Sequence, residues 1–389
     1  MFRLSKFLTV FCALVLTMAL VAGCGGQQQA GTSSGSSENQ PAEAEEVKIG
    51  TIGPLTGDVA TYGISTKNGV EIAVDQVNES GRINGKKVVL ISEDTRGDQT
   101  EAANAASKLI ERDKVVAIVG GVISAETMTA GPIANDAGIV MISSSSTAQG
   151  IPDIGDYIFR NCLSDEVQAV QLAEFAVNEL GLKKFAIMFT NNDYGLSLRN
   201  AFAAKAEEIA EVVGVETYND GEKDFRAQLT KLKGANPDAL YIAGYYTEAA
   251  KIAQQAKEQG LNVQLLGADG FYSPVLVELG GDAVEGAVFT AGFFTDDPSE
   301  NAQNFVKAYK EKFNEEPDMF AAQAYDAAMI LLNALKKTNG QGGEALQKEM
   351  ANTKDFPGIT GTTSFTENGD ALKDIIILKV ENGKFAKLR

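Results

Sequence analysis

The feature that most constrains the fold is a regular alternation of short apolar segments with amphipathic segments, which begins at Val47. In the first part of the chain, apolar runs of strand length are separated by segments with helical periodicity. Strands are expected at 47–53, 87–93, 115–120 and 138–143, with helices at 63–78, 99–112 and 125–136. Such alternation produces right-handed crossovers and a mainly parallel sheet with helices on both faces. This part therefore predicts one doubly wound α/β lobe.

A second series of the same kind starts after Cys162. Its strands are expected at 184–190, 212–218, 239–244, 264–269 and 286–292, and its helices at 165–180, 195–211, 224–233 and 247–259. A second parallel sheet implies a second lobe. The chain then continues with two long helices, at 298–314 and 319–337, and finishes with a strand pair at 374–380 and 383–388. Such a tail indicates several crossovers between the lobes, which predicts a hinge.

The first residues, MFRLSKFLTVFCALVLTMALVAGC, place Arg3 and Lys6 before an apolar run that ends in small residues. This arrangement predicts a secretory signal peptide over residues 1–23. The alternative is a transmembrane anchor, but the apolar stretch is short for a span and breaks at Gly-Cys-Gly-Gly. The VAGC ending resembles the bacterial lipobox, which implies cleavage before Cys24 and a diacylglycerol on its sulfur. Residues 24–46 are polar, so they are expected to form a flexible tether.

The composition argues against several classes of function. The chain has no histidine, which excludes Ser-His-Asp and Cys-His triads and histidine metal sites. No GxxxxGK(S/T) loop occurs, and no expected strand is followed by GxGxxG. We therefore expect no catalytic residue, no metal and no cofactor, and we predict that the protein is not an enzyme.

The charge of the chain indicates which partners to expect, and its cysteine content indicates whether an internal disulfide can form. The formal net charge of −18 repels nucleic acid and anionic lipid, so the lipid on Cys24 is the expected membrane contact. Cleavage of the leader removes Cys12, and lipidation uses Cys24, which leaves Cys162 alone. The mature chain therefore has no internal disulfide, although an oxidising compartment would permit one.

Polar and aromatic residues follow the expected strands at the positions where ligands bind in parallel sheets. They are Tyr62, Ser124, the run Ser145-Ser146-Thr147, Tyr194, Tyr245, Tyr246 and Asp269. Hydroxyls and helix-terminal N–H groups bind a carboxylate, an aspartate pairs with an ammonium, and rings surround an apolar group. The set suits a zwitterion with an apolar tail.

Each of these residues also has an ordinary structural interpretation. Ser124 is suited to cap a helix, and residues 143–147 are suited to a polar loop. The tyrosines, taken singly, are suited to packing, and Asp269 before Gly270 is suited to a turn. Their convergence at the ends of strands favours binding.

Four segments resemble a known family: VKIGTIGPLTGDVATYG, NGVEIAVDQVNESGRINGKKVVLISED, TEAANAASKLI and EKDFRAQLTKLKGANPDALYIAGYY. In this order they look like the leucine/isoleucine/valine-binding proteins of bacterial ABC transporters, which are type I solute-binding proteins. The resemblance covers Val47 to Arg389. It implies two α/β lobes that are joined by three crossovers and close around a ligand. Lobe 1 is then expected at 47–164 plus 293–362, and lobe 2 at 165–292 plus 363–389.

The resemblance also implies roles for individual residues. The contacts to the ligand's carboxylate and ammonium fall on Ser124, Ser146 (through its backbone) and Thr147 in lobe 1, and on Tyr245 and Asp269 in lobe 2. The aromatic wall falls on Tyr62, Tyr194 and Phe320.

The chain departs from the family pattern at two places. The best-known members carry glutamate where this chain has Asp269, so the ammonium must sit deeper or be reached through water. They also have a lobe 1 disulfide, for which this chain has Gly97 and Ile123.

The expected function is that of an extracytoplasmic, lipid-anchored solute-binding protein. It is expected to capture an amino acid, with a branched-chain one favoured, and to deliver it to a membrane permease driven by ATPase subunits. One alternative keeps the fold but binds an aromatic acid, urea or a short amide. Another is a sensor that signals to a partner.

Overall fold

The computed structural model describes residues 45–389, and it is this part of the chain that the following sections concern. The predicted signal peptide, the lipidation site at Cys24 and the predicted tether up to residue 44 lie outside the described residues. The first strand starts at Glu46, so the end of the expected tether belongs to the folded body.

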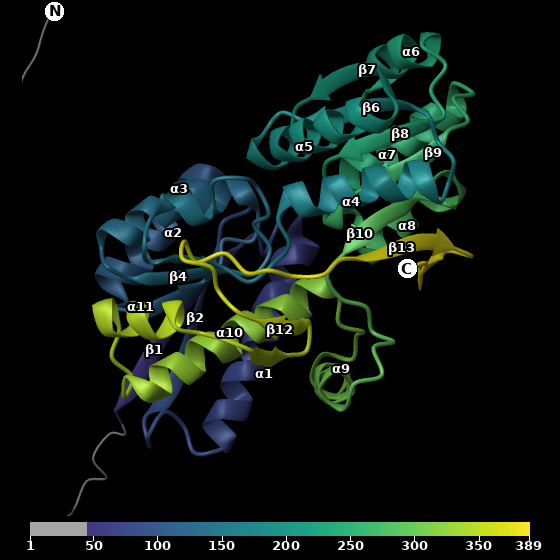
Figure 1. Ribbon diagram of the computed structural model, residues 1–389. Coiled ribbons are helices and arrows are strands. Elements are labelled where there is room, and N and C mark those ends of the chain that lie inside the picture. Colours follow the sequence, from purple (N-terminus) through teal and green to yellow (C-terminus); the bar gives the residue numbers. More distant parts are fainter. Residues whose placement is uncertain (1–44) are drawn as a thin grey trace, which may run out of the picture. The chain divides into compact units, whose positions relative to one another are not determined.

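The first sheet is entirely parallel and has the strand order β2-β1-β3-β4-β5. Its strands are β1 (Glu46–Gly53), β2 (Lys87–Asp94), β3 (Ala117–Val119), β4 (Val140–Ser143) and β5 (Ile158–Arg160). The helices of its βα units are α1 (Ala60–Glu79), α2 (Gln99–Ser107) and α3 (Ser124–Asp136). We call these elements, with those that pack on them, lobe 1 (Figure 1).

Alternate side chains of the central strands of lobe 1 enter two different cores. Ala117 and Val119 pack with α1 and α10, whereas Ile118 between them packs with α2 and α3. The same alternation holds along β4, where Val140 and Ile142 lie in one core and Met141 in the other. Successive strand residues point to opposite faces, so helices cover both faces of the sheet. The predicted doubly wound lobe is confirmed.

The second sheet has the order β14-β13-β10-β9-β8-β6-β7, and only its last two strands in sequence are antiparallel to their neighbours. Its strands are β6 (Lys184–Thr190), β7 (Glu211–Tyr218), β8 (Ala239–Ala243), β9 (Gln264–Gly267), β10 (Val288–Ala291), β13 (Ile376–Glu381) and β14 (Lys384–Lys387). Its helices are α4 (Asp165–Asn178), α5 (Asp193–Ile209), α6 (Arg226–Gly234), α7 (Tyr246–Glu258) and α8 (Pro274–Gly280). We call this group lobe 2 (Figure 1).

The chain passes between the lobes three times. It leaves β5 for α4, leaves β10 for α9 and α10, and leaves β12 for β13. The elements of this last part are α9 (Glu300–Phe313), α10 (Met319–Lys337), α11 (Gly343–Ala351), β11 (Phe356–Gly358) and β12 (Gly361–Thr363). Three crossovers agree with the fold that the resemblance implies. The residue limits given above for each lobe stay a prediction.

Several short elements were not predicted from the sequence, namely β5, α8, α11, β11 and β12. β5 and β12 span only three residues each, too few to show a periodic pattern. The helix expected at 99–112 ends as an α-helix at Ser107 and continues as a π-helical turn to Arg112. The strand expected at 264–269 ends at Gly267, because Asp269–Phe271 forms a 3-10 turn.

Helix α10 docks against α1 through a glycine. An added Cβ at Gly69 on α1 would lie 2.1 Å from the carbonyl oxygen of Ala321 on α10. Only a residue without a side chain allows the two backbones to approach so closely.

Replacing Gly69 with alanine is expected to destabilise the protein by about 1–3 kcal/mol, because a buried backbone must move to make room. Urea unfolding followed by circular dichroism measures the change. Gly234→Ala is the matched control, since an added Cβ at Gly234 meets nothing within 4 Å. Equal stability of the two variants would contradict the proposed close contact.

Candidate ligand-binding cleft

A cavity of about 10 Å³, room for about one water molecule, lies between the lobes at the ends of the parallel strands. Lobe 1 and α10 contribute Tyr62, Val122, Ile123, Ser124, Ser145 and Phe320, and lobe 2 contributes Tyr194, Tyr245, Asp269 and Gly270.

The serine run after β4 connects two loops of lobe 1. Ser143 and Ser146 donate their hydroxyls to the carbonyl of Gly121, over 2.8 and 3.0 Å. Ser145 donates its hydroxyl to the carbonyl of Val122 over 2.7 Å. These hydroxyls satisfy buried carbonyls of the loop before α3, which would otherwise be costly to bury. The run therefore supports the loop before α3, which forms part of the cavity wall.

Glu126 holds the same loop from the other side. Its carboxylate accepts hydrogen bonds from the backbone N–H groups of Val122 and Ile123, at 3.1 and 3.3 Å, and from the hydroxyl of Thr95. Burial raises its pKa to about 7, against the effect of these hydrogen bonds. Ser124 is the first residue of α3 and is not its N-cap; its Oγ accepts a hydrogen bond from the backbone of Ala148. The start of α3, where backbone N–H groups lack partners inside the helix, thereby lines the cavity.

Arg160 forms hydrogen bonds with the loop after β4. Its Nη1 donates to the carbonyls of Thr147 and Ala148, each at 2.9 Å. Its Nη2 lies 2.6 Å from Oδ2 of Asp370, next to the third crossover. The bidentate ion pair fixes the planar guanidinium, so the loop after β4 is held in one conformation.

Aromatic rings from both lobes form a continuous wall. Tyr62 stacks on Phe320 with ring centroids 4.2 Å apart, and Tyr194 stacks on Tyr245 at 5.1 Å with nearly parallel planes. Tyr62 and Tyr245 meet edge to face at 6.1 Å. This wall is apolar on its faces and presents hydroxyls only at its edges.

Asp269 brings a carboxylate to the cavity from lobe 2. Its side chain is 4% exposed, and its Oδ1 accepts a hydrogen bond of 2.7 Å from the hydroxyl of Tyr194. Its backbone N–H donates to Oε1 of Gln168. Burial raises the pKa of Asp269 to about 6, although hydrogen bonds from Tyr194 and Gln168 oppose the shift. A buried carboxylate held only by neutral groups favours a cation nearby.

Most of the predicted site residues meet in this one cavity. Ser146 and Thr147 are fully buried but are not part of its wall. The N–H of Ser146 donates to Oγ of Ser143 over 2.9 Å, whereas the hydroxyl of Thr147 has no partner among residues 45–389. The wall instead includes Ser145, which precedes them in the same loop. Contact of these residues with a ligand stays a prediction.

Hydrogen bonds between the lobes enclose the cavity. The hydroxyl of Tyr62 donates to the carbonyl of Gly270, and the hydroxyls of Thr61 and Ser273 lie 3.1 Å apart. The hydroxyl of Thr247 donates to the carbonyl of Asp58 over 2.8 Å. The structure therefore has its lobes closed.

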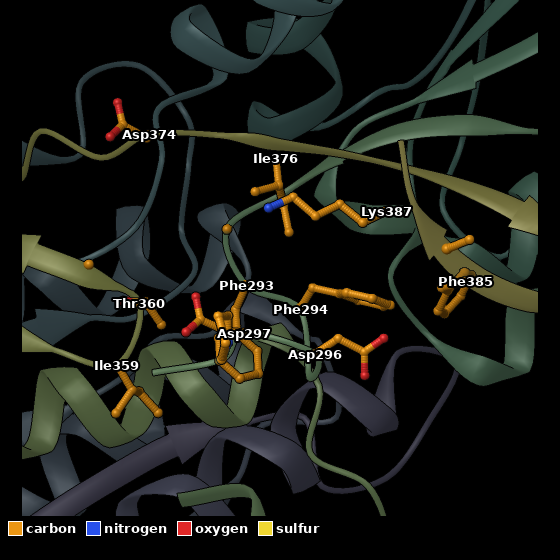
Figure 2. A pocket seen from close by; sticks show the side chains of 14 residues that line it. Phe293, Phe294, Asp296, Asp297, Ile359, Thr360, Asp374, Ile376, Phe385 and Lys387 are labelled. Atoms are coloured by element: carbon orange, nitrogen blue, oxygen red, sulfur yellow. The ribbon is translucent and has the colours of Figure 1, made fainter. Parts of the chain in front are cut away.

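A larger cavity of about 530 Å³ lies at the second and third crossovers (Figure 2). The rings of Phe293 and Phe294 lie near Asp296 and Asp297, while Asp374 stands apart from them. These three carboxylates are exposed, and charges in water are poor determinants of small-ligand binding. This hinge cavity lacks the convergent buried polar groups that mark the cleft.

Comparison with known proteins places the chain in a family. The model of the periplasmic binding protein family matches residues 46–384. The chain belongs to this family. The Leu/Ile/Val-binding protein BraC3 of Rhizobium johnstonii is 32% identical over 350 residues, which cover 88% of this chain and 94% of the relative.

Solved structures of similar proteins support the same family assignment. The leucine-binding protein LivK of Thermotoga maritima is 36% identical with a TM-score of 0.84, over 88% of this chain and 98% of that chain. The branched-chain amino acid transporter substrate-binding protein LivJ of Streptococcus pneumoniae, solved in complex with isoleucine, is 34% identical with a TM-score of 0.82, over 88% and 99%. The resemblance inferred from the sequence is confirmed.

The structure also shows one of the places where the chain departs from the family pattern. Gly97 and Ile123 are neighbours, because an added Cβ at Gly97 would lie 3.9 Å from Cδ1 of Ile123. The place implied for the family's disulfide therefore holds an apolar contact here, and Cys162 is buried as a free thiol.

Within residues 45–389, no helix combines the length and apolarity needed to span a bilayer.

Replacing Tyr62 with phenylalanine is expected to shift the protein toward an open form, because it removes one hydrogen bond between the lobes and keeps the ring. A typical loss of about 0.5–1.5 kcal/mol corresponds to at most roughly tenfold in the population ratio. Small-angle X-ray scattering measures the change as a larger radius of gyration. Tyr325→Phe is the matched control, since the Tyr325 hydroxyl bonds Gln76 within lobe 1. An unchanged scattering curve for the Tyr62 variant would contradict the role of this hydrogen bond.

Proposed function

We propose that the protein binds an amino acid with an apolar side chain, most simply leucine, isoleucine or valine, and delivers it to an ABC permease with its ATPase subunits. The observation that carries this proposal is the convergence of three kinds of group in one cavity between the lobes. Lobe 1 supplies hydroxyls and a helix N-terminus, lobe 2 supplies the carboxylate of Asp269, and both supply aromatic rings.

The carboxylate of the ligand is assigned to lobe 1. Ser124 stands at the start of α3, where the helix dipole and free N–H groups favour an anion. The unpartnered hydroxyl of Thr147 adds a donor when the ligand enters. Ser146 already uses its N–H inside the loop, so its proposed part is to hold the backbone around the carboxylate.

The ammonium and the side chain of the ligand are assigned to the other walls. Asp269, with Tyr245 beside it, receives the ammonium, either directly or through one water. Tyr62, Tyr194 and Phe320 pack against the apolar side chain, since stacked rings exclude water from it.

The proposed mechanism is closure of two lobes around the ligand. The ligand first binds the donors of lobe 1 in the open form, and the contacts to Tyr245 and Asp269 form only on closure. Because the ligand interacts more strongly with the closed form, it shifts the population toward that form. The permease then receives a closed, loaded protein.

The relatives support this ligand class. The names of similar proteins specify leucine, isoleucine and valine, and one similar structure holds isoleucine. An aromatic acid, urea or a short amide lacks the ammonium, so it would leave the Asp269 carboxylate buried without a cation.

The first test of ligand class is a thermal-shift screen of the mature protein against the standard amino acids, benzoate, urea and acetamide. Leucine, isoleucine or valine is expected to raise the melting temperature most, because a ligand at 100 times its Kd stabilises by about 2.7 kcal/mol. A shift with benzoate, urea or acetamide and none with any amino acid would overturn the proposal.

Deletion of the gene tests transport. Loss of amino acid uptake is expected if the protein feeds a permease, whereas unchanged uptake would favour a sensor.

Replacing Asp269 with alanine is expected to weaken binding of the amino acid by about 2–5 kcal/mol, since the ammonium then stays buried and unpaired. Isothermal titration calorimetry measures the affinity, and circular dichroism checks the fold. Asp282→Ala removes an exposed carboxylate of the same lobe and is expected to bind as the wild type does. Unchanged affinity of the Asp269 variant would exclude an ammonium contact.

We further propose that a lipid on Cys24 anchors the protein outside the cytoplasm, on the basis of the leader and its VAGC ending. The full-length wild type is expected to enter the detergent phase in a Triton X-114 partition. The Cys24→Ala variant is expected to lose the lipid and to stay out of that phase. Partition of wild type and variant into the same phase would contradict the anchor.

A further inference from the structure

Glu126 is a buried titratable group that the proposed ligand contacts do not use. It is the third residue of α3 and is 0% exposed. Its Oε2 accepts hydrogen bonds from the N–H groups of Val122 and Ile123, over 3.1 and 3.3 Å. Its Oε1 accepts the hydroxyl of Thr95, the residue after β2. Because Val122 and Ile123 line the cavity, the carboxyl group of Glu126 is bonded directly to the cavity wall.

The charges next to Glu126 do not neutralise it. The nearest charge that acts on it is that of Asp94, at the end of β2, which is also negative and raises its pKa. Arg96 and Asp98, which follow Thr95, are exposed, so water screens their charges. Across the cleft, Glu126 acts on the hydroxyl of Tyr245, whose pKa its charge raises.

The other elements that pack on α3 supply no free cation. Within residues 45–389, the cations on these elements are engaged elsewhere: Arg160 with Asp370, Arg199 over the ring of Phe189, and Lys205 with Glu174. The acidic residues on these elements are all at least partly exposed: Glu101, Asp153, Asp193, Glu207 and Glu208. Glu126 is therefore a buried carboxyl group held only by neutral donors.

The proposed function brings a second carboxylate to the same helix start. The carboxylate of the ligand is assigned to Ser124, which directly follows the two residues that Glu126 bonds. Both anions would then lie at the first turn of α3 with no cation between them. Two close buried carboxylates share a proton in preference to ionising together. The ligand keeps its charge more easily, because its own ammonium compensates it.

The surroundings of Glu126 can accommodate a proton. Oε1 faces the hydroxyl of Thr95, which can accept a hydrogen bond as well as donate one. A proton on Oε1 reverses this bond, while Oε2 keeps the N–H groups of Val122 and Ile123. The neutral side chain thus supports the same loop. Burial raises the pKa of Glu126 to about 7 even without a ligand, so protonation near neutral pH costs little free energy.

We propose that Glu126 takes up a proton when the ligand's carboxylate binds, so that the loaded protein holds a carboxylic acid behind one bound carboxylate. The proton comes from the solvent and binds Oε1. Glu126 is a positioning residue, since it acts through Val122 and Ile123 and does not line the cavity. This proposal rests on the proposed function, because it requires a ligand carboxylate at the start of α3.

Proton uptake makes binding depend on pH. Because the pKa of Glu126 is higher in the loaded protein than in the free one, the affinity falls as the pH rises through the free-protein value. With that value at about 7, linkage predicts that Glu126 alone makes binding roughly tenfold weaker at pH 8 than at pH 6.

The decisive experiment compares the wild type with Glu126→Gln by titration with leucine at pH 8, in buffers that differ in ionisation enthalpy. At this pH Asp269, with a pKa of about 6, is already ionised. The glutamine oxygen can accept from the loop and its Nε2 can donate to Thr95, so the variant keeps the geometry without the proton. The wild type is expected to take up between about 0.5 and 1 proton per leucine more than the variant. Equal proton uptake by the two proteins would overturn the proposal.

Glu248→Gln is the matched control. Glu248 is the third residue of α7 in lobe 2, is 4% exposed, and accepts the N–H of Gly221 over 2.9 Å. It holds the same place on its helix as Glu126, but no ligand carboxylate is assigned there. Its variant is expected to take up as many protons as the wild type. Equal loss of uptake in both variants would contradict the special place of Glu126.

Infrared difference spectroscopy of the wild type supplies an independent readout. Addition of leucine at pH 8 is expected to produce the C=O band of a carboxylic acid, which Glu126→Gln lacks. Because the band is read from the wild type, the test holds even if a variant folds poorly. Leucine binding without this band would overturn the proposal. Failure of the wild type to bind any amino acid would instead overturn the proposed function.

Discussion

The structure depends on burying polar groups, including the carboxylate of Asp269, between the two lobes. Parallel strands bring their carboxyl ends to one edge of a sheet, and the two sheets present these edges to each other across the cleft. Asp269 and the start of α3 therefore line the same cavity although they lie on different lobes. Burial without a compensating cation costs free energy, and the proposed ligand removes this cost when its ammonium arrives.

The polar wall of lobe 1 is stable because its own groups are satisfied before any ligand enters. Ser143, Ser145 and Ser146 bond the loop before α3, Glu126 bonds its N–H groups, and Arg160 bonds the carbonyls after β4. Such pre-organisation lowers the conformational entropy that binding must remove. The hydroxyls of Ser144 and Thr147 are the exceptions, since neither has a partner among residues 45–389.

The hinge combines buried polar contacts with exposed chain. Asp326 on α10 accepts hydrogen bonds from the backbone of Ile359 and Thr360, and Lys373 donates to the hydroxyl of Thr363. These bonds tie the third crossover to lobe 1. The second crossover, at Phe293 and Phe294, borders the hinge cavity.

The sequence by itself determined the two doubly wound lobes, because alternating apolar and amphipathic segments permit few other arrangements. It also pointed to Tyr62, Ser124, Tyr194 and Asp269, since residues that follow parallel strands gather at one edge. Only the tertiary structure showed that the serines bond a neighbouring loop and that Ser145, rather than Ser146 or Thr147, lines the cavity. Hydrogen-bond partners and burial arise between segments far apart in the chain, where local periodicity carries no information.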